Sequence, residues 1–309
     1  MPHRPAETDG ERSVWWSWLL SVAWLPWMLR ITWIAVAAVG WPAVSSAVGG
    51  RSDAVDWVAT VGSVVAWIAG VVAMAIPATV SLTAVRVIVP LAPLAGLATL
   101  VGGGDTADGV ETIVVGTLAT LVAMSGEVGK LFVQASAYGD EERLPLRPPL
   151  GFAIAAVLAW VVWAGAVMTG PLLLAAKAWV PGGFVTALAI VAMATLPRRW
   201  HQLSRRWLVL VPAGLALHDP VVLGETLMLR RSEVARIRLA PADTEAADLT
   251  GPATGNAIEV GTASAVTAHL APTRQQPRGR AIHLTAFLTS PTRPGRALLA
   301  AGKRHLPVG

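Results

Sequence analysis

The chain has no cysteine among its 309 residues. This absence excludes disulfides, thiolate metal sites and a cysteine nucleophile, although it says little about the compartment. Charged residues are also scarce, at 14% of the chain, where soluble domains carry about 25%. Because 54% of the residues are hydrophobic and the mean hydropathy is +0.58, the composition predicts a membrane protein with a smaller soluble part.

Catalytic and metal-binding motifs are missing as well. The sequence contains no G-x-S-x-G, H-E-x-x-H or G-x-G-x-x-G. None of the six histidines stands at a close metal-ligand spacing with another histidine or with carboxylates, and we interpret His269 and His283 as outward-facing strand residues. The only acidic run, Asp140–Glu142, reads as a solvated loop, with docking onto the basic C-terminal part as the alternative. We therefore expect no enzyme, no cofactor and no metal site.

Long apolar stretches dominate the first two thirds of the chain. About 20 apolar residues in a helix cross a bilayer core. Pro90 and Pro93 should kink the third stretch, and Gly62, Ala66 and Gly70 should form a helix-packing face in the second. The predicted spans are 29–48, 54–76, 80–101, 112–134, 150–175 and 182–197.

The segment 14–30 holds five of the fourteen tryptophans and is interrupted by Pro26. Tryptophan favours the headgroup region, so we predict an in-plane interfacial helix at the end of a cytoplasmic N-terminal region, 1–28. A separate seventh span is the alternative, and it would place the N-terminus outside.

The loops between the spans predict the orientation. The loop 102–111 carries three acidic residues and no basic one, which places it outside. The loop after 134 contributes Arg143 and Arg147, and the stretch after 197 contributes four arginines, which places both inside. Six spans then leave both termini in the cytoplasm of a bacterial inner (cell) membrane.

Glu127 and Lys130 are unusual in the fourth stretch, because ionisable groups inside a bilayer are costly unless they pair or face a cavity. Arg86, in the third stretch, and Glu127 each lie 16 residues from the loop 102–111. In an antiparallel hairpin they would lie at the same depth, so we predict an Arg86–Glu127 ion pair, with Lys130 reaching the interface. The cluster either fixes the register of the hairpin or forms a proton relay, an ion path or a ligand site.

Short alternating segments replace the long apolar runs in the soluble domain, predicted over 198–309. A hairpin is predicted by two alternating segments, RWLVLVP and LALHD, which AG connects. At the end of the domain we expect a helix from about Pro294 to Arg304. In the last strand we expect Ile282, Leu284, Ala286 and Leu288 to face inward. Further strands are expected at 226–230, 235–240, 257–260, 266–270 and 281–288, with loops at 241–256 and 271–280. This order predicts a small barrel or bent sandwich closed by a helix.

RRWLVLVPAGLALHDP and SPTRPGRALL, together with this element order, resemble the pleckstrin-homology-like (PH-like) domains of bacterial membrane proteins. The whole chain, most clearly from about 130 onward, also resembles uncharacterised multi-pass membrane proteins of high-GC actinobacteria. In those proteins a segment similar to AYGDEERLPLRPP recurs with the RRW…VPAG…HDP entry. The resemblance implies a helical membrane protein with a C-terminal PH-like domain, and it implies no activity.

Positive charge is concentrated in the C-terminal part. Residues 198–309 hold 15 basic and 7 acidic residues, whereas 1–197 hold 9 and 12. A basic domain beside a membrane suits anionic headgroups better than nucleic acid, for which no motif is present. The predicted membrane-proximal basic patch comprises Arg198, Arg199, Arg205, Arg206, Arg274, Arg278 and Arg280; satisfying the positive-inside rule is the simpler explanation for it.

From these observations we expect a scaffold or accessory subunit of the membrane. Its cytoplasmic domain would bind a partner protein or anionic lipid. A small transporter or channel component that uses Arg86, Glu127 and Lys130 is the alternative.

Overall fold

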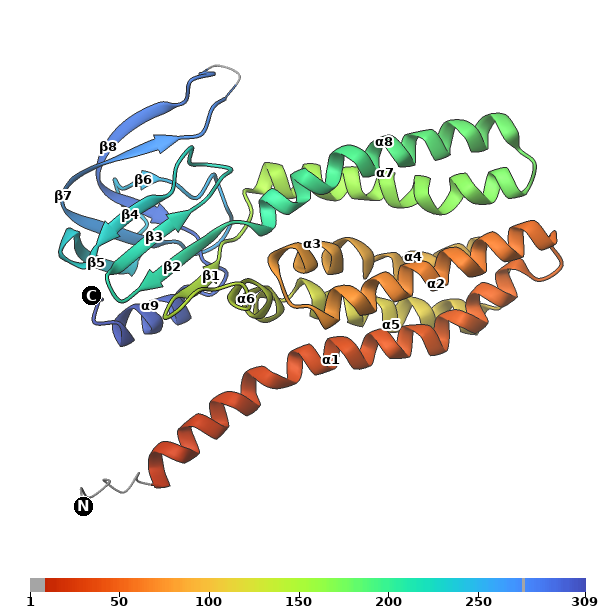
Figure 1. The fold of residues 1–309 in the computed structure, drawn as a ribbon, viewed down its shortest axis with the longest axis horizontal. Helices are drawn as coiled ribbons and strands as arrows, with labels where there is room; N and C mark the ends of the chain where they lie inside the picture. The colour runs from red at the N-terminus through yellow and green to blue at the C-terminus, as the bar shows by residue number, and fades with distance from the viewer. Residues whose placement is uncertain (1–8, 274–275) are drawn as a thin grey trace.

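Six helices of the chain are long and apolar enough to cross a membrane. The structure is a computed structural model, which describes residues 9–273 and 276–309, with side chains from Trp24 onward. The helices lie side by side, with the sheet-rich C-terminal domain at one end (Figure 1). The spans are formed by α1 (Asp9–Val48), α2 (Asp53–Ala75), α3 (Thr79–Ile88) with α4 (Leu91–Val101), α5 (Thr106–Met124), α7 (Leu150–Ala175) and α8 (Trp179–Ser204).

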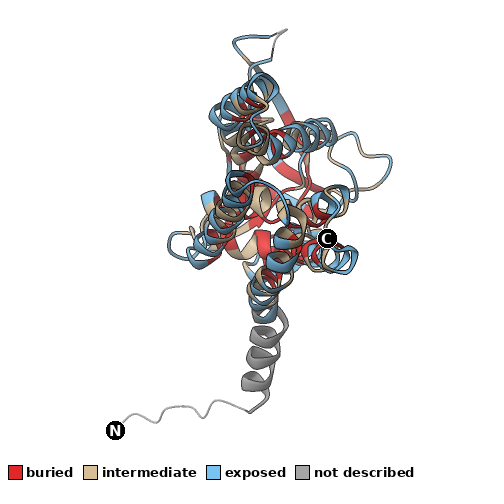
Figure 2. Ribbon diagram, turned by 90° about the vertical axis from the view of Figure 1, so that its right-hand side faces the viewer, coloured by how far each residue is buried: buried red, intermediate tan, exposed pale blue. Residues whose placement is uncertain are grey.

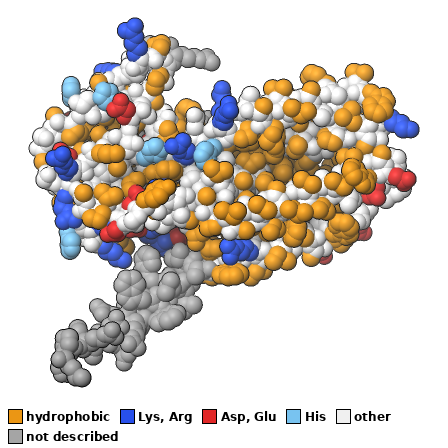
Figure 3. Space-filling view, viewed as in Figure 1, with side chains coloured by type: hydrophobic (Ala, Val, Ile, Leu, Met, Phe, Trp, Pro, Cys, Tyr) orange, Lys and Arg blue, Asp and Glu red, His pale blue; other side chains and the backbone are white. Residues whose placement is uncertain are grey.

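The surface of this helical bundle is apolar. Figure 3 shows hydrophobic side chains over most of the helical half, with charged side chains gathered over the C-terminal domain and at the far helix ends. Seen along the helices, exposed residues point outward and buried ones lie between the helices (Figure 2). Large apolar side chains such as Val157, Leu158 and Ile190 are more than half exposed. The chain is therefore a multi-pass membrane protein by the length and composition of its helices.

The first span begins earlier than the sequence predicts. α1 runs without a break from Asp9 to Val48, with Pro26 and Pro42 inside it, and its candidate span is Trp24–Val48. The segment 14–30 is therefore not a separate helix, and the side chains of 14–23 lie outside the described residues. A proline removes one hydrogen bond of a helix and bends it without always ending it, which is why Pro26 is not a boundary.

The third span is broken where the prolines predict a kink. α3 ends at Ile88 and α4 begins at Leu91, because Pro90 has no N–H to continue the helix. Trp160 of α7 donates its indole N–H to the carbonyl of Val87, at 2.9 Å. The break is thus satisfied by a neighbouring helix, as a membrane interior requires.

Two tryptophans lock α1 against α2. Trp33 Nε1 donates to the carbonyl of Trp67, and Trp67 Nε1 donates to the carbonyl of Trp33, both at 3.0 Å. The ring of Trp33 lies on Gly70, where an added Cβ would approach it to 2.6 Å. The predicted packing face is therefore formed at Gly70, whereas Gly62 is exposed and meets nothing within 4 Å.

The fourth span is shorter than predicted. α5 ends at Met124, and the nine residues after Ser125 form a separate helix, α6 (Gly126–Gln134). Ser125 takes an extended conformation (φ −61°, ψ 147°) and its hydroxyl accepts a hydrogen bond from the N–H of Val128, so it caps α6. The expected span 112–134 is wrong beyond Met124, and Glu127 and Lys130 lie outside the candidate spans.

The C-terminal domain contains two four-stranded sheets and, in the described residues, no closed barrel. The first sheet has the order β1 (Glu142–Pro145), β2 (Trp207–Val211), β3 (Gly214–His218), β4 (Leu227–Arg230). The second has the order β5 (Val234–Leu239), β7 (Ile258–Leu270), β8 (Arg280–Thr289), β6 (Ala247–Asp248). The helix α9 (Pro294–Lys303) follows. Since α8 continues to Ser204, the domain begins later than 198, and it takes β1 from the segment between α6 and α7.

The strand register agrees with the sequence in one sheet and departs from it in the other. The predicted hairpin is formed by β2 and β3. The expected strands 257–260 and 266–270 are one strand, β7, whose register against β8 shifts between Gly261 and Val266. Because of this shift, Leu284 and Phe287 are buried in the domain core, whereas Ala286 lines a surface groove. The expected inward positions of Ala286 and Leu288 are therefore wrong.

The domain and the membrane helices share an apolar core. Leu208 and Leu210 of β2 pack in the core of the domain, whereas Trp207 and Val209 pack with residues of α1, α3, α5 and α6. The strand β2 is thus buried on both faces, which explains the uninterrupted apolar run WLVLV. The C-terminal domain is held directly on the bundle rather than tethered by a linker.

Candidate functional site

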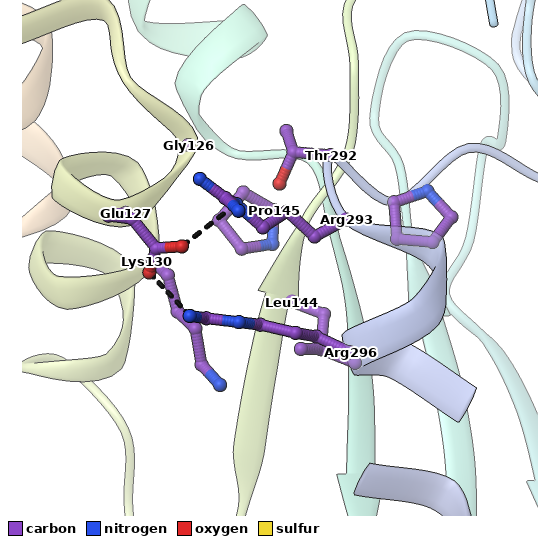
Figure 4. Close-up of a pocket in the computed structure, with 9 residues that line it drawn as sticks. Gly126, Glu127, Lys130, Leu144, Pro145, Thr292, Arg293 and Arg296 are labelled. Carbon is purple, nitrogen blue, oxygen red and sulfur yellow. Dashed lines mark hydrogen bonds and ion pairs between the residues drawn. The ribbon is translucent and has the colours of Figure 1, made fainter. Parts of the chain in front are cut away.

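The break at Ser125 positions Glu127 at the junction between α6 and α9. With Ser125 extended, the helical periodicity of α5 does not continue into α6, and Glu127 turns toward the C-terminal domain. Its side chain is 6% exposed. A buried carboxylate needs charged or hydrogen-bonding partners, and Figure 4 shows where they come from.

Two arginines of the C-terminal helix region bind this carboxylate. Arg296 Nη1 donates a hydrogen bond of 2.6 Å to Glu127 Oε2. Arg293 Nε lies 2.8 Å from Oε1, in an ion pair that is not aligned as a hydrogen bond. Pro294 at the first turn of α9 fixes the start of the helix between them. The site is therefore a carboxylate clamped by two guanidinium groups from a segment more than 160 residues away.

The surroundings of this carboxylate leave little space. A cavity of about 10 Å³ is lined by Gly126, Glu127 and Lys130 of α6, by Leu144 and Pro145 of β1, and by residues 291–293 and 296. A volume of this size holds about one water. The geometry is that of a structural joint and leaves no room for a substrate.

Further ion pairs join the same parts of the chain. Lys130 pairs with Glu142 of β1, and Arg304 pairs with Asp140, at 2.8 Å. Glu141 pairs with Arg143. All three residues of the acidic run 140–142 therefore form ion pairs, and Asp140 forms its pair with the C-terminal domain. This agrees better with the alternative, docking onto that domain, than with a solvated loop.

The predicted Arg86–Glu127 ion pair does not form. Glu127 is bound by Arg293 and Arg296, and Arg86 of α3 lies instead against Gly129, where an added Cβ would be 2.9 Å from Nη2. The comparison of depths correctly placed Arg86 beside α6, but it predicted the wrong contact residue. The extended conformation of Ser125 turns Glu127 toward the C-terminal domain, away from Arg86. Of the three predicted cluster residues, only Arg86 lies within a candidate span.

Arg206 is not part of a membrane-facing basic patch. It forms a two-point ion pair with Asp219, with Nε–Oδ1 at 2.7 Å and Nη2–Oδ2 at 2.6 Å, and both side chains are fully buried. Its other donors reach the carbonyls of Arg147 and Thr250. Arg206, directly before β2, therefore links this strand to the segment between β1 and α7 and to Thr250. The prediction that Arg206 contacts lipid headgroups is wrong.

The remaining predicted basic residues do not form one patch. Arg198, Arg199 and Arg205 are exposed at the end of α8, where it meets the domain. Arg278 and Arg280 are exposed on the turn side of the β7–β8 hairpin, which projects from the domain (Figure 1). Arg274 lies outside the described residues. Two basic regions therefore replace the single patch.

A polar groove on the second sheet had no clear signal in the sequence. It encloses about 610 Å³ and is lined by Arg236 and Arg238 of β5, by Glu259 of β7, and by residues 241, 243–247, 265 and 283–286. Glu259 is 1% exposed and is covered by the two arginines and by the hydroxyl of Thr244. Burial alone would raise the pKa of Glu259, but the hydrogen bonds from Thr244 and the arginines hold it below its usual value.

The histidines of the C-terminal domain do not gather into a site. His283 bonds to Thr267 across the strand pair, and His269 is exposed two residues further along the same face. The described part of the chain contains no group of three His, Asp or Glu residues that could hold a metal ion. No protein-family model, no curated protein and no solved structure matches this chain.

Proposed function

We propose that the chain is a membrane-embedded scaffold or accessory subunit whose C-terminal domain lies in the cytoplasm and binds a partner protein. The observation that carries this proposal is the attachment of the domain to the membrane helices. A shared apolar core and the Glu127 clamp fix the domain at one end of the bundle. A domain held in this way can position a bound protein at a defined distance from the bilayer.

The charges of the domain support a partner with an acidic surface. The chain contains no Asp or Glu after Glu259. In this C-terminal stretch, Arg293, Arg296 and Arg304 form ion pairs with Glu127 and Asp140, in the segment between the fourth and fifth spans. Arg278 and Arg280 are exposed and make no ion pair with the described residues. The β7–β8 hairpin therefore offers unpaired positive charge, which favours association with acidic proteins.

The distribution of charge also supports the proposed orientation in a bacterial cell membrane. Arg198, Arg199 and Arg205 lie at the domain end of α8, and Asp105, Asp108 and Glu111 lie at or near the opposite end of the bundle. The positive-inside rule places the basic end in the cytoplasm. Two mostly antiparallel sheets followed by α9 support the resemblance to a PH-like domain, with open sheets in place of a closed barrel.

Transport has less support from the same observations. A relay or an ion path would use Arg86, Glu127 and Lys130 inside the bilayer. Glu127 and Lys130 instead lie outside the candidate spans, and each is paired with an oppositely charged residue. Of these three residues only Arg86 remains inside a candidate span, and a single residue does not form a path.

The test is affinity purification of the full-length protein from its native host in a mild detergent. The wild type is compared with R278Q/R280Q, which removes the hairpin charge, and with R198Q/R199Q, which removes the same charge from α8. We expect a protein at near-equal abundance with the wild type and with R198Q/R199Q, and at least a tenfold loss with R278Q/R280Q. A wild-type chain that returns alone would contradict the scaffold proposal. A partner retained by R278Q/R280Q would place the binding surface elsewhere.

A further inference from the structure

Arg86 is a charged residue of the spans for which the structure supplies no counter-charge. It lies on α3 within the candidate span Thr79–Val101. Its Nε is buried and makes no hydrogen bond, and no ion pair joins the guanidinium to any described residue. An uncompensated charge in a membrane protein is costly, so such groups pair with an anion or face water.

Four carboxylates follow the fourth span on the same side of the bundle as Arg86. They cannot act as its counter-ion, because each already has a basic partner. Glu127 is bound by Arg293 and Arg296, Asp140 by Arg304, Glu141 by Arg143 and Glu142 by Lys130. The described residues therefore leave no free carboxylate on this side of the bundle to act as the counter-ion of Arg86.

The packing around Arg86 leaves the guanidinium at the junction of α3, α6 and α8. Its Nη2 lies over Gly129 of α6, where any larger residue would displace it. One turn earlier on α3, Thr83 forms a hydrogen bond of 3.0 Å with Nδ1 of His201 on α8. Residues three apart are neighbours on a helix surface, so the hydroxyl–imidazole pair borders the region that Arg86 occupies.

The depth of Arg86 indicates which anions can reach it. It lies seven residues from Thr79, the first residue of the span at the domain end, which is roughly 10 Å along a helix. A long arginine side chain extends over several ångströms toward the interface, and its head commonly meets the headgroup layer from such a position. The residue as a whole has intermediate exposure, although its Nε is buried.

From this geometry we propose that Arg86 is a phosphate-binding residue, and that the phosphate is the headgroup of an anionic lipid seated between α3, α6 and α8. A guanidinium presents paired N–H donors that match two phosphate oxygens, and the bond between them is charge-assisted. The phosphate diester of a lipid lies at the depth that Arg86 reaches. The site is separate from the exposed arginines of α8 and of the β7–β8 hairpin.

The test uses thermal unfolding of the full-length protein, delipidated in detergent. The probes are phosphatidylglycerol, diacylglycerol of the same chain length, which lacks the phosphate, and inorganic phosphate. The variants are R86Q, R86K and, as the control, R30Q. Arg30 is an arginine of α1 that already has partners, the carbonyl of Met74 and the ring of Trp27.

Two results are expected together. Without lipid, R86Q should unfold at the same temperature as the wild type or higher, because it removes an uncompensated charge. Phosphatidylglycerol should raise the unfolding temperature of the wild type and R30Q by several degrees and that of R86Q by less than half as much. R86K should keep part of the shift, because an ammonium retains the charge but not the paired donors. Diacylglycerol should have no effect.

Other results would change or overturn the proposal. A shift with inorganic phosphate equal to that with the lipid would support the phosphate site but make free phosphate its source. An equal phosphatidylglycerol shift in the wild type and R86Q would overturn the proposal. If R86Q does not fold, native mass spectrometry of the wild type and R86K decides the question. The average number of phosphatidylglycerol molecules retained should be lower in R86K than in the wild type, and equal retention would overturn the proposal.

Discussion

Arg296 donates a hydrogen bond of 2.6 Å to Glu127 across 169 residues of chain. It joins the first turn of α6, which directly follows the fourth span, to the last helix of the C-terminal domain. Arg293 adds a second charge to the same carboxylate. This relationship explains why an acidic residue stands where the sequence reads as a membrane span.

Substituting Glu127 by glutamine should loosen the domain from the bundle. The carboxylate is 6% exposed, whereas Arg293 and Arg296 are 53% and 32% exposed and can turn to water. We therefore expect a loss of about 1.5–3 kcal/mol, the range for a hydrogen bond to a charged group. Unfolding of the full-length protein in detergent measures it. E142Q, which removes the more exposed pair with Lys130, should cost less.

A double-mutant cycle separates the pair from other effects of the substitution. E127Q and R296Q should be non-additive, with a coupling energy of at least about 0.5 kcal/mol, since the residues share one hydrogen bond. Additive losses would mean that the two side chains act independently.

Substituting Asp219 by asparagine should be the most damaging single change in the C-terminal domain. It leaves Arg206 fully buried without a counter-charge, and breaking a buried ion pair in this way costs about 3–5 kcal/mol. D243N, at an exposed position of the same domain, is the control. Protease resistance of the domain in the full-length protein is the measurement, and equal resistance of the two variants would contradict the assignment.

Two glycines of α2 should respond to alanine in opposite directions. A Cβ at Gly70 would lie 2.6 Å from the ring of Trp33, whereas at Gly62 it would meet nothing within 4 Å. G70A should destabilise the α1–α2 contact by about 1–3 kcal/mol through overpacking. G62A should be neutral or stabilising, because alanine is the better helix former. Equal effects in a thermal melt would show that Trp33 does not pack on Gly70.

His218 should make the protein less stable in mild acid. Burial lowers the pKa of His218, and the positive charges of Arg205 and Arg143 lower it further, while Asp219 acts in the opposite direction. Because the folded state then binds fewer protons than the unfolded one, the contribution is complete above the unfolded pKa of about 6.5. It is lost as the pH falls through the lower folded value.

The measurement for His218 is the unfolding temperature at about pH 7.5 and about pH 5.5, on either side of the usual histidine pKa. H218N should show a smaller drop between the two than the wild type. The control is H283N, at an exposed histidine of β8. A wild-type drop that H218N leaves unchanged would show that His218 does not carry the effect.

Local patterns in the sequence predict the elements but not their partners. Pro90 predicts the break in the third span, and alternation predicts the β2–β3 hairpin, because both depend on residues close in sequence. The strand β1 was missed: ERLP is short, lies between two membrane helices, and pairs with β2 more than 60 residues away. The reciprocal hydrogen bonds of Trp33 and Trp67 have no local signal either, since the two residues lie on different helices, 34 positions apart.

The sequence by itself determined that this is a helical membrane protein with a basic, strand-rich C-terminal part, because hydropathy and alternation are properties of neighbouring residues. Only the tertiary structure decided which charges meet. Glu127 binds Arg296 rather than Arg86, Arg206 is buried against Asp219 rather than exposed to headgroups, and Arg86 has no ion-pair partner among the described residues. The physical reason is that ion pairing depends on the direction of each side chain, and one extended residue, Ser125, changes that direction for the whole of α6.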